Sequence, residues 1–172
     1  LNDTDIDTIE MNIPCQNVKQ GGVQFGTSCA GVEDITKAVR AHCKKPLMVK
    51  LSPNVTDISE IALAAESAGA DAVSMIHNNT GGFSGPALLP IAVRMVWQTY
   101  QKVKIPIVGL GGISTWQDAV EMLLAGATAL QIGTVLFTDP YAPVKITEGL
   151  TNYMDKNGVK TLSELTGAMR PW

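Results

Sequence analysis

Short apolar runs rich in β-branched residues alternate along the chain with longer segments whose apolar residues recur at helical spacing. This alternation is typical of βαβ units and predicts an α/β fold with a parallel sheet. Five strands are expected, at Thr8–Ile13, Leu47–Leu51, Ala72–Ile76, Pro106–Leu110 and Ala129–Gly133. Helical segments follow them at about Glu33–Cys43, Ile58–Ala68, Ile91–Val103, Trp116–Ala125 and Val144–Lys156.

The number of these units limits the possible architectures. Five βα units cannot close a barrel of eight strands, and the sequence opens almost directly on a strand at Thr8. Two interpretations remain, an open parallel sheet or a barrel of which some strands are missing from the sequence.

Two consecutive strands end in glycine turns that are suited to binding a phosphate. Gly111 and Gly112 precede a helix whose N-cap is expected at Ser114 or Thr115, where N–H groups at the helix start would attract an anion. The next strand ends on Gly133. Either turn alone is more simply a tight βα connection, but together they match the phosphate site after strands seven and eight of a (β/α)₈ barrel.

A cysteine among amide side chains is the first candidate for chemistry. Cys15 lies just past the first strand, between Asn12 and Asn17, and amides supply both donors and acceptors for a ligand that carries amides or imides. The alternative is a buried cysteine with a packing role, which is the role assigned to Cys29 and Cys43.

A lysine at the end of an apolar strand is the second candidate. Lys50 closes the run "LMVK", and it is either a side chain that reaches solvent from the strand end or a cation at a barrel mouth that stabilises a developing anion. His42 and His77 have no carboxylate at metal-ligand spacing. No protein-bound metal is expected.

Composition narrows the function classes. The 172 residues are 45% hydrophobic and 17% charged, with a net charge of −3, so no basic surface for nucleic acid is expected. Neither a signal peptide nor a membrane span is evident. Three cysteines leave one unpaired and make a disulfide framework improbable, so a reducing, cytoplasmic location is expected.

With Asn12, Cys15, Asn17, Lys50 and the glycine turns together, the chain resembles the dihydroorotate dehydrogenases of class 1. The stretches "VKLSPNVTDI", "AESAGADAV", "TGGFSGPA" and "GLGGIST" are similar to subclass 1B, which works with an iron–sulfur and FAD partner subunit. The resemblance implies a (β/α)₈ TIM barrel of which residues 1–172 form the C-terminal part, about strands 4 to 8 of a single FMN-binding domain.

The resemblance also implies roles for individual residues. Cys15 is the base that removes a proton from C5 of dihydroorotate while C6 passes a hydride to FMN. Asn12, Asn17 and Asn78 contact the pyrimidine, and Lys50 approaches the N1/O2 side of the flavin ring. The residues implied in cofactor binding are Asn12, Lys50, Ile76, Gly85, Gly111, Gly112, Gly133 and Thr134.

The chain departs from the family pattern at several places. The family usually reads N-x-S-C-P-N, whereas this sequence reads "NIPCQN", with Pro14 in place of serine and Gln16 in place of proline. The first three of the eight βα units and a stretch between Ile76 and Gly85 are expected to be missing.

The resemblance further implies dihydroorotate and orotate as ligands, a homodimer, and a heterotetramer with the iron–sulfur/FAD electron-transfer subunit. Three alternatives stay open. One is a flavin barrel similar to dihydropyrimidine dehydrogenase, and another is a barrel fragment with only a structural or interaction role. The third, a phosphate-binding isomerase or synthase, would need carboxylates at strand ends, whereas Glu10 and Asp71 are read as preceding or beginning strands.

Overall fold

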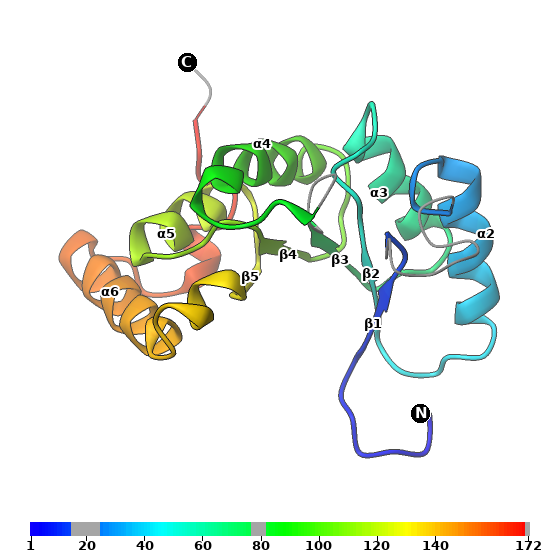
Figure 1. The fold of residues 1–172 in the computed structure, drawn as a ribbon, viewed down its shortest axis with the longest axis horizontal. Helices are drawn as coiled ribbons and strands as arrows, with labels where there is room; N and C mark the ends of the chain where they lie inside the picture. Colours follow the sequence, from blue (N-terminus) through cyan, green and yellow to red (C-terminus); the bar gives the residue numbers. More distant parts are fainter. Residues whose placement is uncertain (15–24, 77–81, 171–172) are drawn as a thin grey trace.

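The computed structural model describes residues 1–14, 25–76 and 82–170 of the chain. Its strands form one parallel sheet with the order β1-β2-β3-β4-β5 (Figure 1). The strands are β1 (Ile9–Asn12), β2 (Leu47–Lys50), β3 (Ala72–Met75), β4 (Ile107–Leu110) and β5 (Ala129–Gln131). The five predicted strands are confirmed, each shorter than expected by one or two residues.

The helices follow the strands along the outer side of the sheet, and consecutive helices lie next to one another (Figure 1). The helices are α2 (Cys29–Arg40), α3 (Ile58–Ser67), α4 (Leu89–Tyr100), α5 (Trp116–Ala125) and α6 (Ala142–Asn157). Three 3₁₀ turns complete the described elements, η2 (Pro86–Leu88), η3 (Thr134–Phe137) and η4 (Leu162–Glu164). Among the described residues, no helix is long and apolar enough to cross a membrane.

The winding of the chain identifies the architecture. Each strand pairs with the next one in sequence, whereas a doubly wound sheet would reverse its strand order at one point. Strands added in sequence order with all helices outside are the winding of a (β/α)₈ barrel. The predicted TIM-barrel fold is therefore confirmed for this portion of a barrel.

The two faces of the sheet differ in polarity. Side chains that face the helices are apolar and at most 1% exposed, namely Leu47, Val49, Val73, Met75 and Ile107. Because side chains alternate along a strand, the opposite face carries Glu10, Asn12, Lys50, Ser74 and Gln131. The hydrophobic core thus lies between sheet and helices, and the inner face is free to carry polar chemistry.

Helices α2, α4 and α6 begin earlier than the sequence predicted, α6 at Ala142 rather than Val144. Helix α2 starts at Cys29 rather than Glu33, because Ser28 caps it by accepting a hydrogen bond from the Gly31 N–H. Helix α4 starts at Leu89 rather than Ile91 and ends at Tyr100. There η2 leads directly into the helix, and Pro90 lies in the first turn, where a missing N–H costs nothing.

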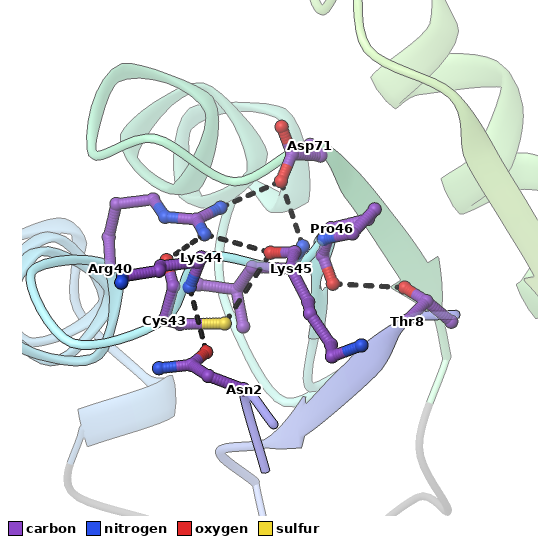
Figure 2. Close-up of polar contacts among 9 residues, drawn as sticks. Asn2, Thr8, Arg40, Cys43, Lys44, Lys45, Pro46 and Asp71 are labelled. Carbon is purple, nitrogen blue, oxygen red and sulfur yellow. Dashed lines mark hydrogen bonds and ion pairs between the residues drawn. The ribbon is translucent and has the colours of Figure 1, made fainter. Parts of the chain in front are cut away.

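A polar cluster fixes the loop that enters β2 (Figure 2). Asp71 Oδ2 accepts hydrogen bonds of 2.8 Å from the Leu47 N–H and from Arg40 Nη1. Arg40 Nη2 in turn donates to the carbonyl oxygens of Cys43 and Lys45. One carboxylate therefore ties the end of α2 and the start of β3 to the first residue of β2.

Replacing Asp71 should reveal the contribution of this cluster. Leu47 is fully buried, so Asp71→Ala leaves its N–H without a partner, at a cost of about 1–3 kcal/mol in the free energy of unfolding. Asp71→Asn keeps an oxygen acceptor and should lose less. Urea denaturation of the full-length protein measures both, and equal losses would assign the effect to charge rather than to this hydrogen bond.

Candidate functional site

A cavity of about 210 Å³ lies at the carboxyl ends of β2 to β5, between the loops that follow these strands. Seven of the residues that the sequence analysis associated with a cofactor line it. They are Lys50, Ile76, Gly85, Gly111, Gly112, Gly133 and Thr134. In a barrel this end of the strands is the one that carries the active site.

The remaining predicted residues are placed less completely. Asn12 is an exposed residue at the end of β1, and its Cα is in register with that of Lys50 on β2. Neighbours in register point to the same face of a sheet, so these two side chains share the inner face. Cys15, Asn17 and Asn78 lie outside the described residues.

The glycines of the two turns differ in what surrounds them. Gly112 has a φ of +80°, and a Cβ placed there would lie 2.5 Å from the Leu89 backbone nitrogen. Its lack of a side chain therefore lets the loop pack against the start of α4. At Gly133, by contrast, a Cβ would meet nothing within 4 Å. Gly133 is thus the glycine that leaves open space in the cavity wall.

The helix start after Gly112 does not offer all the donors that the sequence suggested. Thr115 is the N-cap of α5 and forms a capping box with Asp118. Asp118 Oδ2 accepts from the Ser114 N–H at 2.9 Å and from the Thr115 N–H at 2.8 Å. These two N–H groups are therefore not open to an anion, because a carboxylate of the same helix already binds them.

A carboxylate on the inner face connects side chains from four strands. Glu10 Oε1 of β1 lies 3.0 Å from Lys50 Nζ of β2. Its other oxygen, Oε2, accepts from Ser74 Oγ of β3 at 3.1 Å and from Gln131 Nε2 of β5 at 2.8 Å. The Glu10 and Lys50 side chains are 24% and 14% exposed, so this ion pair is largely removed from solvent.

The surroundings of Glu10 keep it ionised. Burial alone raises its pKa, but the hydrogen bond from Gln131, the hydrogen bond and charge of Lys50, and the bond from Ser74 together outweigh burial. The net effect is a pKa below the ordinary value of 4.5. Near neutral pH, Glu10 is therefore a carboxylate that accepts hydrogen bonds and does not donate them.

Glu10, Ser74 and Gln131 were not predicted as site residues from the sequence. Glu10 was expected to precede or begin a strand, whereas it is the second residue of β1. The available signal was its spacing of two residues from Asn12, which places both on one face. Among the described residues, no group of three His, Cys, Asp or Glu side chains could hold a metal ion.

Comparison with known proteins identifies the family. The model of the dihydroorotate dehydrogenase family matches residues 3–80 and 75–154. The two matches overlap at residues 75–80, at the place where a stretch of the family sequence is expected to be missing.

Two curated relatives carry the name dihydroorotate dehydrogenase B (NAD(+)), catalytic subunit. The protein of Parabacteroides distasonis is 53% identical over 181 residues, covering 95% of this chain and 59% of the relative. That of Alkaliphilus oremlandii is 47% identical over 186 residues, covering 98% and 62%. The chain thus spans about 60% of the length of these relatives.

A crystal structure supports the fold. The dihydroorotate dehydrogenase of Eimeria tenella, solved in complex with ferulenol, superposes with a TM-score of 0.85. The superposition covers 94% of this chain and 54% of that one at 21% sequence identity. The match therefore supports a shared fold for the two proteins.

Acid should weaken the folded state through Glu10. Between its lowered pKa and 4.5, the unfolded chain binds more protons than the folded one, so falling pH favours unfolding. The stability from ionised Glu10 is complete above about pH 4.5 and is lost as pH falls through the folded pKa. Urea denaturation across this range should show the full-length protein losing stability relative to Glu10→Gln, and a constant difference would contradict the assignment.

Proposed function

Because the chain belongs to the dihydroorotate dehydrogenase family, we propose that the protein oxidises dihydroorotate to orotate with FMN as its cofactor. One observation carries the proposal. The family positions for cofactor binding, which lie far apart in the sequence, converge on one cavity at the carboxyl ends of β2 to β5. The family match favours this function over that of the dihydropyrimidine dehydrogenase-like barrels.

The described residues fit part of FMN. The cavity of about 210 Å³ is smaller than the ~300–1,000 Å³ of typical sites for whole small molecules. Its two chemically distinct ends suit two parts of the cofactor. Lys50 supplies a cation for the N1/O2 edge of the flavin ring, and the open wall at Gly133 and Thr134 leaves room for the phosphate.

The reaction removes a proton from one carbon of a C–C bond and a hydride from the other, so it requires a base for the proton and an acceptor for the hydride. When bound, FMN supplies the acceptor for the hydride that leaves C6 of dihydroorotate. We assign Cys15 as the base whose thiolate takes the proton from C5, so that the electrons of this C–H bond form the C5=C6 double bond. Asn12, Asn17 and Asn78 are assigned to hold the pyrimidine between base and acceptor.

The names of the relatives support a proposal for the assembly. Both relatives are called catalytic subunits of an NAD(+)-linked enzyme. We propose that residues 1–172 are the C-terminal portion of a single FMN-binding TIM-barrel domain that forms a homodimer. In this proposal the dimer joins an iron–sulfur/FAD electron-transfer subunit in a heterotetramer that serves pyrimidine biosynthesis in the cytoplasm.

A methyl group at Gly133 should test the phosphate end. Gly133→Ala projects into open space, so the fold should be kept while FMN affinity falls about tenfold, equivalent to ~1.4 kcal/mol. Flavin titration of the apoprotein measures the affinity, and thermal unfolding checks the fold. Gly112→Ala is the contrasting variant and should destabilise the protein, because its Cβ would lie 2.5 Å from the Leu89 nitrogen. Unchanged affinity in Gly133→Ala would locate the phosphate elsewhere.

Removal of the thiol should test the base. Cys15→Ala should retain FMN and orotate binding, while flavin reduction by dihydroorotate slows about 10²–10⁴-fold, the usual effect of losing a general base. Cys15→Ser should be similarly slow near neutral pH and recover partly at high pH, because a hydroxyl is a weaker acid. Stopped-flow reduction of the bound flavin gives the rates, and reduction of Cys15→Ala at the parent rate would identify another base.

A further inference from the structure

Glu10 forms hydrogen bonds with two of the residues that line the cavity. Lys50 and Gln131 line the cavity, and each is bound by a different oxygen of the Glu10 carboxylate, at 3.0 Å and 2.8 Å. Glu10 is not one of the lining residues within the described part of the chain. Any influence of Glu10 on a ligand in the cavity therefore passes through Lys50 and Gln131.

Because Glu10 is a carboxylate, it determines how the Gln131 amide is oriented, and it binds one proton of the Lys50 ammonium. An ionised carboxylate only accepts hydrogen bonds, so Gln131 must turn its NH₂ group toward Glu10 and its carbonyl oxygen away. Lys50 has three ammonium protons and uses one on Glu10 Oε1. The other two remain for Lys50 to donate elsewhere.

We propose that Glu10 is a positioning residue that fixes the Lys50 ammonium and the Gln131 amide, and so sets how the cavity interacts with its ligand. The inference rests on the proposed function in taking this ligand to be FMN. Ser74 adds a third hydrogen bond to Glu10, at 3.1 Å, and it is fully buried. The carboxylate is thereby held by side chains of β2, β3 and β5.

Glutamate is specifically suited to this position. Lys50 and Gln131 use different oxygens of Glu10, and glutamine at position 10 has only one acceptor oxygen, so in this geometry it can accept from only one of them. Its own NH₂ group would then face one of two donors. Aspartate keeps both oxygens and the charge but is shorter by one methylene group. If Glu10 served only to link the strands, replacing it could change the stability of the protein but would not alter how Lys50 acts on a ligand.

A double-mutant cycle on the full-length, FMN-loaded protein tests the proposal. The midpoint potential of the flavin is measured in the parent, Glu10→Ala, Lys50→Met and the double variant. If Glu10 acts through Lys50, Glu10→Ala should change the ratio of reduced to oxidised flavin by about tenfold at a fixed potential, which is ~30 mV for two electrons. In the Lys50→Met background the same substitution should change this ratio less than about twofold, because coupled residues are not additive.

Two further variants guard against failure to fold. Glu10→Asp should recover part of the parent potential, and Glu10→Gln replaces Glu10→Ala in the cycle if the alanine variant is unstable. Ser74→Ala is the matched control, because it removes one hydrogen bond from Glu10 and leaves both cavity-lining partners in place. Its potential should stay close to that of the parent.

The outcomes separate this inference from the proposed function. The same shift in both Lys50 backgrounds, or no shift in either, would overturn the positioning role of Glu10 while leaving an FMN enzyme. A parent protein that binds no FMN would instead overturn the proposed function, before the cycle is begun.

Discussion

The hydrogen bond between Glu10 and Gln131 joins the two outermost strands across the inner face, and it can form only in a curved sheet. Glu10 and Gln131 lie on the two outermost strands of the five-stranded sheet, and their side chains meet at 2.8 Å. In a flat sheet, four strand spacings would separate these strands by roughly 19 Å. Two side chains that each extend about 5 Å from Cα, with bonds near 1.5 Å, cannot bridge that distance. The hydrogen bond therefore requires the sheet to curl, and the curl brings the strand ends around one cavity.

The outer face of the sheet sets how closely the helices can approach this curled surface. Gly109 of β4 is in contact with α5, since a Cβ there would lie 2.4 Å from Met122 Cγ. Gly112 allows an equally close approach to the start of α4. The loop from Gly111 to Ser114 is thus held between two helices. The packing of these glycines against the helices therefore supports the shape of this part of the cavity wall.

Much of this fold could be read from the sequence because it depends on local patterns. Strand and helix alternation predicted every βα unit described, and glycine turns after β4 and β5 predicted which loops line the cavity. The Glu10 network could not be read in this way, because it depends on register and curvature across four strands. The capping of α5 by Asp118 was missed for a related reason. The sequence shows where helix N–H groups begin but not which of them a side chain has already bound.

The charges around the cavity divide it into two chemically different ends. Lys50 is the one charged side chain among the described lining residues, and Glu10 accompanies it at 3.0 Å. A cation paired in this way exerts a weaker long-range attraction than a free one, but it still donates hydrogen bonds in a fixed direction. That end suits a polar ring edge better than a phosphate. At the other end, Asp118 removes two helix N–H groups from use. An anion there would depend on the loops at Gly111 to Ile113 and Gly133 to Thr134, which line the cavity.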